Sequence, residues 1–386
     1  MNRAVVLVGC VLFVAMLGSN LPAPLYEAYR VRFATTTFAM TVVFASYPLA
    51  LVATLFALAR LPDRIGRRPT LALGLIAAAL GSIAFATATG FAALVAGRLC
   101  AAIAIGAIGA AGPPALVELD AAHDRRRAAL VATFALTLSC GIAPFLSGVL
   151  AVTTSTAFVT PYLVNVVLCG LALVSLAFVP ETRPLSAGPR DAATARDAVP
   201  KLDAVERRTF VVATLTSGIV WWLASLFVSI VPAFVATLLG VHSPALQGAL
   251  ALIVFVVSPL AQTLGRRLSD GAASRAGLVG TAIALAALLG AVPARSLALF
   301  AAGSTIAGVA HGLGYLGAQS AVNRIGTPAA RARLSARFYA ATYLCIGITL
   351  LAIGALTAPL GLYGALAVVA AAAALAALLL AGLTTR

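Results

Sequence analysis

The sequence predicts an all-α integral membrane protein with twelve transmembrane helices in two pseudo-symmetric six-helix bundles. The composition is the first reason: of 386 residues, 62% are hydrophobic and 10% are charged, whereas a soluble domain is about half apolar and a quarter charged. The second reason is length, because a helix crosses a bilayer in about 20 residues and apolar runs such as 70–89 and 365–383 are this long. Transmembrane β-barrels show alternating strands instead. The third reason is an internal repeat.

Hydropathy divides the chain into twelve apolar segments, and each is a predicted transmembrane helix. They are residues 4–26, 38–59, 70–89, 91–117, 128–152, 161–179, 209–235, 246–264, 276–292, 296–320, 335–357 and 360–383. The first segment is long and has no small-residue cleavage site, so we expect it to be retained as a helix. Residues 180–208 are polar and predict a cytoplasmic linker. The predicted domains are therefore 1–179 and 209–386.

The basic residues set the orientation. With a cytoplasmic N-terminus, 22 of the 26 basic residues fall in cytoplasmic segments and Arg30, Arg32 and Arg295 fall outside. Because basic residues are retained on the cytoplasmic side, we expect a multi-pass protein of the cytoplasmic (inner) membrane with both termini inside. The net charge of +15 is then a topology signal, and nucleic acid is not an expected partner.

Several short motifs, glycines and basic clusters of the first half recur in the second half, 206 or 207 residues later. The pairs are residues 61–63 with 268–270, Gly141 with Gly347, Gly148 with Gly354, and the basic cluster ending at Arg127 with the one ending at Arg333. Parallel repeats of this kind are typical of transporters that hold a substrate near the bilayer midplane, between their halves. A duplication without transport is the alternative.

Residues 59–68 read Ala-Arg-Leu-Pro-Asp-Arg-Ile-Gly-Arg-Arg. A basic turn that only sets topology explains the arginines, but it does not explain Asp63 followed three residues later by Gly66. Gly66 permits a tight turn that a side chain would strain. The Asp63 carboxylate can accept from guanidinium groups and from free amides at a helix N-terminus.

This motif resembles the loop between helices two and three of the major facilitator superfamily, usually Gly-x-Leu-Ala-Asp-Arg-x-Gly-Arg-Arg, with Ala59 and Pro62 as departures. The resemblance implies a gate that locks the cytoplasmic ends of the two halves together when the transporter opens outward. The implied gate residues are Asp63, Arg64, Gly66, Arg67 and Arg68, with Glu118 or Asp120 as their partner and Asp270 in a weaker copy of the loop in the second half.

Two further segments resemble motifs of the same superfamily. Arg98, in Gly-Arg-x-x-x-Ala-x-x-x-Gly, is a charge inside an apolar span and should face a partner or a watery cavity; the resemblance links it to proton transfer in drug–proton antiporters. Snorkelling to the outer interface is the alternative. Residues 141–148 resemble the antiporter motif, with Gly141, Pro144 and Gly148 kept, which implies export. A plain kinked helix is the alternative.

The residue that couples transport to protons is not obvious. Helix one is similar to that of drug–proton antiporters, but Asn20 stands near the position of their acid, and an amide does not titrate near neutral pH. No Asp or Glu lies in the middle of a predicted span. Glu27, Arg98 and His311 are the coupling candidates, since an imidazole titrates near neutrality; a packed core histidine is the alternative for His311.

A substrate cavity needs apolar walls and a few directional polar groups. The candidates to line it are Asn20, Tyr47, Asn165, Trp221, Trp222, Tyr315, Gln319 and Tyr343. Interhelical packing or interfacial anchoring is the alternative for each. This mixture suits a neutral or weakly amphipathic substrate.

The predicted function is proton-coupled efflux of a small organic molecule by alternating access, with a proton gradient as driving force and no metal or other cofactor. Membrane lipid and the substrate are the expected partners, and a monomer is the expected state. A proton-linked importer or an uncoupled facilitator of a sugar or organic acid is the alternative. A polytopic membrane enzyme is a distant one, since no catalytic motif is evident.

Overall fold

The computed structural model describes residues 2–120, 125–182, 202–325 and 328–384. Within these ranges the chain is helical and contains no strand. The N-terminal elements are α1 (Arg3–Asn20), η1 (Ala23–Leu25), α2 (Tyr26–Arg32), α3 (Thr37–Ala57), α4 (Leu61–Ile65), α5 (Arg67–Ala86), α6 (Phe91–Leu119), α7 (Arg125–Thr153), α8 (Thr160–Ser175) and η2 (Leu176–Phe178). The C-terminal elements are α9 (Ala204–Ser229), α10 (Val231–Leu239), α11 (Pro244–Gly265), α12 (Asp270–Gly290), α13 (Leu297–Arg324) and α14 (Pro328–Leu383).

Most of these helices are long and apolar. Ten helical stretches of the described chain have the length and composition to cross a membrane, and Thr160–Leu176 is a shorter apolar helix. The last stretch, within α14, contains two helices joined at Gly361, whose φ of 69° is not helical. The all-helical membrane fold is therefore confirmed, and these elements accommodate the twelve predicted spans, whose exact number stays a prediction.

Three boundaries differ from the sequence prediction. The first span continues through α2 to Arg32, so Glu27 lies on a helix. Helix α9 begins at Ala204, inside the predicted linker, because Asp203 and Glu206 form a reciprocal capping box at its N-terminus. Helix α12 begins at Asp270, where the Ser269 side chain caps the Ala272 amide.

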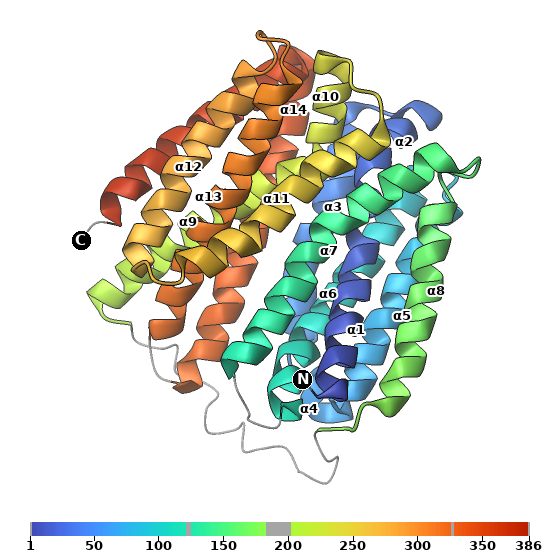
Figure 1. The fold of residues 1–386 in the computed structure, drawn as a ribbon, viewed down its shortest axis with the longest axis vertical. Helices are drawn as coiled ribbons and strands as arrows, with labels where there is room; N and C mark the ends of the chain where they lie inside the picture. Colours follow the sequence, from blue (N-terminus) through green and yellow to red (C-terminus); the bar gives the residue numbers. More distant parts are fainter. Residues whose placement is uncertain (1, 121–124, 183–201, 326–327, 385–386) are drawn as a thin grey trace.

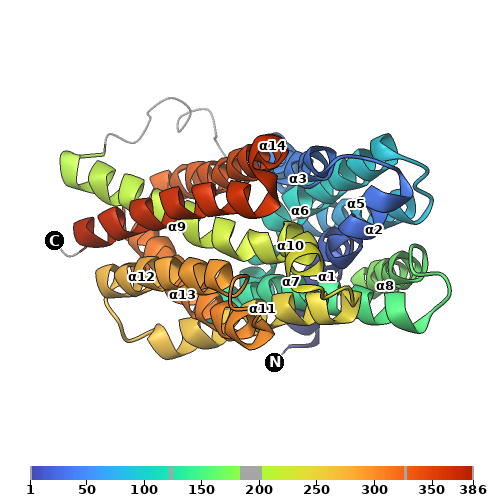
Figure 2. The same cartoon turned by 90° about the horizontal axis from the view of Figure 1, so that it is seen from above.

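The helices form two groups, α1 to α8 on one side of the molecule and α9 to α14 on the other (Figures 1 and 2). We call them the N-terminal and C-terminal groups. Helix α4 lies at one end of the molecule, and α2 and α10 lie at the opposite end (Figure 1). We call the end with α4 the arginine-rich face, after Arg60, Arg64, Arg67 and Arg68, and the other end the opposite face.

The two groups contact each other through α7 with α11 and through α3 with α14 (Figure 2). Glycines make this close approach possible. A side chain at Gly148 would collide with the backbone carbonyl of Pro244, and one at Gly248 with that of Pro144. A side chain at Gly354 would collide with Thr41. Helix packing in membranes relies on such small residues, because apolar side chains gain little by leaving lipid.

Candidate functional site

The candidate gate is built on the short helix α4 and the start of α5. Gly66 joins them with a φ of 99°, a conformation that glycine adopts without strain. The turn places Arg67 within 3.5 Å of the Asp63 carboxylate and within 3.3 Å of the Glu118 carboxylate at the end of α6. Arg67 thus joins α4, α5 and α6 at the arginine-rich face. These pairs all lie within the N-terminal group.

A carboxylate that the sequence analysis did not identify completes this network. The oxygens of Glu181 accept hydrogen bonds from the backbone amides of Arg67 and Arg68, at 2.9 and 3.0 Å. These amides are the first of α5 and have no partner within the helix. The Thr182 hydroxyl donates to Glu118 at 2.5 Å. A Cβ at Gly66 would lie 2.6 Å from a Glu181 oxygen, so the glycine also makes room for the cap.

The other acidic candidates make separate pairs. Asp120 is buried and lies 3.9 Å from Arg127 at the start of α7. Asp270, at the start of α12, lies 3.2 Å from Arg324 at the end of α13. Arg324 is 206 residues after Glu118, so each group holds an ion pair at the corresponding place. Arg64 and Arg68 are exposed.

Arg98 is buried in the N-terminal group and does not snorkel to the interface. Arg98 is only 2% exposed. Its two terminal nitrogens donate hydrogen bonds to the backbone carbonyls of Ser19, at 2.5 Å, and Phe44, at 3.4 Å. The guanidinium carbon lies 4.7 Å from the ring centroids of both Phe44 and Tyr47. Its Nε and the Tyr47 hydroxyl have no hydrogen-bond partner among the described residues. The alternative of an interfacial anchor is therefore wrong.

His311 lies at the centre of the C-terminal group. Its Nδ1 is 2.8 Å from the Ser258 hydroxyl on α11, and this hydroxyl accepts from Gln262 at 3.3 Å. When Nε2 carries the proton of the neutral ring, Nδ1 accepts from the Ser258 hydroxyl; in the other tautomer Nδ1 donates to it. The Trp221 ring meets His311 edge to face at 4.4 Å. A second proton on His311 would require the Ser258 hydroxyl to turn away.

A row of half-buried polar rings continues from His311 along the C-terminal group. Tyr315 stacks on His311 at 6.1 Å, and its hydroxyl lies 3.4 Å from that of Tyr339. Tyr339 donates to Gln319 at 3.1 Å. The sequence analysis missed Tyr339, although it precedes Tyr343 by one helical turn and so shares its face.

Tyr343 connects the row of rings to the N-terminal group. Its ring meets that of Tyr47 edge to face at 6.5 Å. Tyr47 and Tyr343 therefore lie at a contact between the groups, and Tyr315, Gln319 and Trp221 extend the set into the C-terminal group. We call this set the central ring cluster.

Three of the predicted cavity residues have other surroundings. Asn165 is fully buried between α8 and α5 and donates to Ser82 at 2.9 Å, so it packs helices within one group. Trp222 is 1% exposed in the hydrophobic core, because it faces away from its neighbour Trp221. We withdraw both from the lining of the site. Asn20 is half-buried and donates to the Ser19 hydroxyl and to the Met16 carbonyl.

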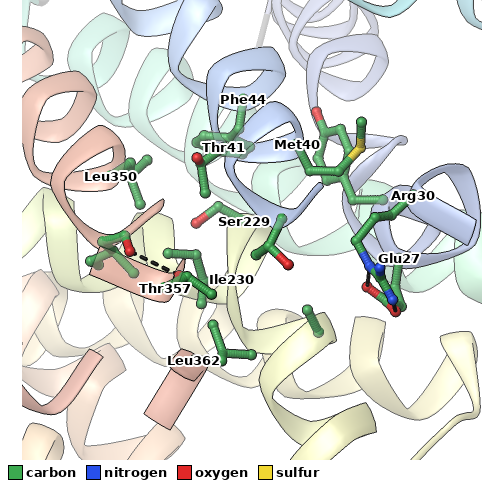
Figure 3. Close-up of a pocket in the computed structure, with 14 residues that line it drawn as sticks. Glu27, Arg30, Met40, Thr41, Phe44, Ser229, Ile230, Leu350, Thr357 and Leu362 are labelled. Carbon is green, nitrogen blue, oxygen red and sulfur yellow. Dashed lines mark hydrogen bonds and ion pairs between the residues drawn. The ribbon is translucent and has the colours of Figure 1, made fainter. Parts of the chain in front are cut away.

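A pocket with about 500 Å³ of atom-free space, part of it open to solvent, lies between the two groups on the opposite face. Figure 3 shows Glu27 and Arg30 at one side of it, joined by an ion pair of 2.6 Å. Phe44 and Ser229 lie at another side (Figure 3). Glu27 therefore lies in a pocket at the opposite face of the molecule, where its carboxylate is paired with the Arg30 guanidinium.

The helix-bend residues lie where α7 meets α11. A Cβ at Gly141 would lie 2.9 Å from Phe255, and Pro144 lies inside α7, which stays helical through it. Gly347 and Gly354 of the second half lie in the same way against Leu49 and Thr41 of α3. The repeated glycines thus occupy equivalent places at the two contacts between the groups.

Within the described residues, no group of three His, Cys, Asp or Glu side chains is arranged to hold a metal ion. The arrangement instead offers a charged network at one face, a pocket at the other, and aromatic and polar side chains between them. Such a molecule can bind and release a small solute, with ion pairs and packed glycines available to hold either end.

A search of curated proteins found no match, but a family model and several solved structures do match the chain. A family model described as Major Facilitator Superfamily matches residues 8–294. A crystal structure of a POT family transporter in complex with 5-aminolevulinic acid has a TM-score of 0.78 at 14% identity and covers 100% of this chain and 97% of its own.

Two further solved structures share the fold. A bacterial homolog of the human lysosomal transporter Spinster, in an inward-facing and occupied conformation, has a TM-score of 0.76 at 16% identity and covers 99% of this chain and 96% of its own. The human organic anion transporter MFSD10 (TETRAN) has a TM-score of 0.67 at 17% identity, with coverage of 99% and 100%. The family model covers most of the chain, and the protein therefore belongs to the major facilitator superfamily and is a multi-pass membrane transporter.

Proposed function

We propose that this secondary transporter exports a small organic molecule in exchange for protons, by alternating access. The N-terminal and C-terminal groups rock about the central ring cluster. The arginine-rich face lies in the cytoplasm, since basic residues favour that side, and the membrane is the cytoplasmic membrane. The substrate enters from the arginine-rich face and leaves through the pocket at the opposite face.

One observation carries this proposal: the repeated glycine pairs lie at both contacts between the groups. Gly148 faces Pro244 of α11, and Gly354 faces Thr41 of α3. Pro244 and Thr41 both lie near the ends of their helices at the opposite face. At that face, α7 therefore packs closely on the backbone of α11, and α14 packs closely on the Thr41 side chain of α3. At the arginine-rich face, the ion pairs of Arg67 lie in the N-terminal group and the Asp270–Arg324 pair lies in the C-terminal group.

Two residues are proposed to carry the proton. Glu27 lies in the pocket at the opposite face, where release of its ion pair with Arg30 would expose it to protons entering from outside. His311 lies beside the central ring cluster, and protonation of its Nδ1 would reverse the hydrogen bond with Ser258, so that Nδ1 donates and the hydroxyl oxygen accepts. The Ser258 hydroxyl must then turn its own proton elsewhere, which changes a contact between α11 and α13 and gives a physical link between proton and movement.

The first experiment identifies a ligand and then measures flux. A thermal-shift screen on purified protein finds compounds that raise the melting temperature, because only folded protein binds them. Proteoliposomes with an imposed pH gradient then report direction. Proton-coupled export predicts substrate movement against a proton influx and loss of accumulation with a protonophore. Movement together with protons would favour an importer, and indifference to the protonophore would favour a facilitator.

The same assay separates the two proton carriers. If Glu27 carries the proton, Glu27→Gln should remove the pH dependence of flux while His311→Gln keeps it, and the reverse holds if His311 carries it. The variant Arg30→Gln is a control, because it breaks the ion pair without removing the Glu27 proton site. A pH dependence that survives in both Glu27→Gln and His311→Gln would refute both assignments.

A further inference from the structure

Arg98 brings a positive charge deep into the apolar part of the N-terminal group. It is the eighth residue of α6, so it lies about 11 Å along the helix axis from its start. A charge at such a depth is costly in a bilayer, and proteins normally offset it with an opposite charge or with backbone carbonyls. Here the guanidinium has two carbonyls and two ring faces as its described contacts.

The chain itself provides no carboxylate at this depth. Of its eleven Asp and Glu residues, none lies in the middle of a predicted span. Glu27, on α2 at the end of the first span, accepts two hydrogen bonds from the Arg30 guanidinium. The ionisable side chains that the structure places around Arg98 are Tyr26, Tyr47 and Tyr162, which are neutral in their common form. Among the described residues, no carboxylate therefore neutralises the positive charge.

Two hydrogen-bond donors at this site are also without partners among the described residues. Among the described residues, the Arg98 Nε is buried without a hydrogen-bond partner. The hydroxyl of Tyr47, a residue that is 9% exposed, forms no hydrogen bond of normal geometry there, although the side chains of Ser19 and Tyr343 lie near it. Buried donors without partners are rare, and each one costs free energy unless something binds to it. Both belong to one contact, since the guanidinium lies over the Tyr47 ring. A guanidinium with a free edge is well suited to the two oxygens of a carboxylate.

The position is next to the proposed path of the substrate. Phe44, on one side of the guanidinium, also lines the pocket at the opposite face. Tyr47, on another side, contacts Tyr343 of the C-terminal group. One ring therefore separates Arg98 from the pocket, and one ring separates it from the plane between the groups. Rocking of the groups moves Tyr343 of α14 relative to Tyr47 of α3 and changes the pocket beside Phe44, which gives a ligand a route to the charge.

From these observations we propose that Arg98 and Tyr47 form the anion-binding part of the substrate site, and that the substrate is an organic monoanion with an aromatic body. This inference rests on the proposed transport function. The anionic group binds the Arg98 guanidinium and accepts from the Tyr47 hydroxyl. The aromatic body packs against Phe44, Tyr343 and Trp221. A cation of the same shape is excluded by repulsion from Arg98.

The test compares ligands that differ only in charge. Calorimetric titration of the full-length protein in nanodiscs would use benzoate, 3-phenylpropanoate and 2-naphthoate, each with its amide and with the amine of the same skeleton. We expect at least one acid to bind about tenfold or more tightly than its amide, since a charge-assisted hydrogen bond contributes that much. We expect no measurable binding of the amines.

Variants then assign the preference to the site. Arg98→Gln should weaken binding of the acid about tenfold to a hundredfold and leave binding of the amide unchanged. Arg98→Lys should keep the preference for the acid, and Tyr47→Phe should reduce it. Arg32→Gln is the matched control, because Arg32 also lies over aromatic rings but at the opposite face, and it should change nothing.

Several results would overturn the inference. They are equal binding of acid and amide, preference for an amine, an unchanged preference in Arg98→Gln, or no binding of any acid. If Arg98→Gln fails to fold, two other measurements still test the inference: the preference of the unaltered protein for the acid over its amide, and the reduction of that preference in Tyr47→Phe. Flux in proteoliposomes separates this inference from the proposed function: transport of amines or amides alone refutes the anion site only, whereas an acid that binds at Arg98 without being moved refutes transport only.

Discussion

At the scale of single residues, Asp63 and Asp270 provide a matched pair. Asp63→Asn removes a carboxylate from the Arg67 and Glu118 network, so we expect the initial rate of flux to fall about tenfold, equivalent to about 1.4 kcal/mol. Asp270→Asn breaks only the pair with Arg324 and should have a smaller effect. Proteoliposome flux measures both, with melting temperature as the check on folding. Near-normal flux in Asp63→Asn would refute the gate.

Glu181 belongs to the same scale, and its effect should be on stability. Glu181→Gln replaces the charged acceptor that caps the first two amides of α5. Loss of a side-chain cap costs about 0.5–2 kcal/mol, so the melting temperature should fall. Glu206→Gln is the control, since it alters the capping box of α9 instead. If the melting temperature of Glu181→Gln rises or stays the same while that of the control falls, the Glu181 cap contributes nothing to stability.

Sequence could identify Gly66, because a φ of 99° strongly favours glycine and the surrounding motif is specific. It could not identify Glu181, which lies 114 residues from its partner amide and has no local pattern that marks it as a cap. The same limit explains Asn165 and Trp222. A polar or aromatic residue in an apolar helix faces either another helix or the path of a solute, and only the packing of neighbouring helices decides which.

At the scale of helices, the contact between α7 and α11 controls closure of the opposite face. Gly148→Leu places a side chain against the backbone of Pro244, and backbone cannot move aside as a flexible side chain can. We expect the variant to shift the population toward the state that is open at the opposite face, with a loss of flux. Reaction of a cysteine at Ser229, in the pocket, with a membrane-impermeant thiol reagent should accelerate.

The control for this experiment is Gly109→Leu. Gly109 is exposed on α6, and a Cβ there would have no neighbour within 4 Å. It should change neither flux nor labelling. If Gly148→Leu also leaves the labelling rate unchanged, the α7–α11 contact does not control access.

The twelve apolar segments show how far hydropathy determines elements. Their positions were predictable because the bilayer sets both length and composition. Their ends were less so: α9 begins earlier than predicted because of the Asp203–Glu206 capping box, and α1 is continued by α2 although the latter carries Glu27, Arg30 and Arg32. Charged residues near the end of a span remain helical because they reach the interface.

At the scale of the whole molecule, the repeat of 206 residues relates features that hydropathy does not connect. It pairs Glu118 with Arg324, and it pairs Gly148 with Gly354. In the structure, the first two form ion pairs at the end of corresponding helices, and the second two lie at the two contacts between groups. This agreement supports two matched halves that move as units.

Distances between the halves in both states would test that movement most directly. After replacement of the five native cysteines, spin labels at Arg64 and Arg337 report on the arginine-rich face, and labels at Thr36 and Thr237 report on the opposite face. Double electron–electron resonance in nanodiscs would be measured at low and high pH. We predict reciprocal changes, with one distance shortening as the other lengthens. Two distances that stay constant, or that change in the same direction, would contradict alternating access.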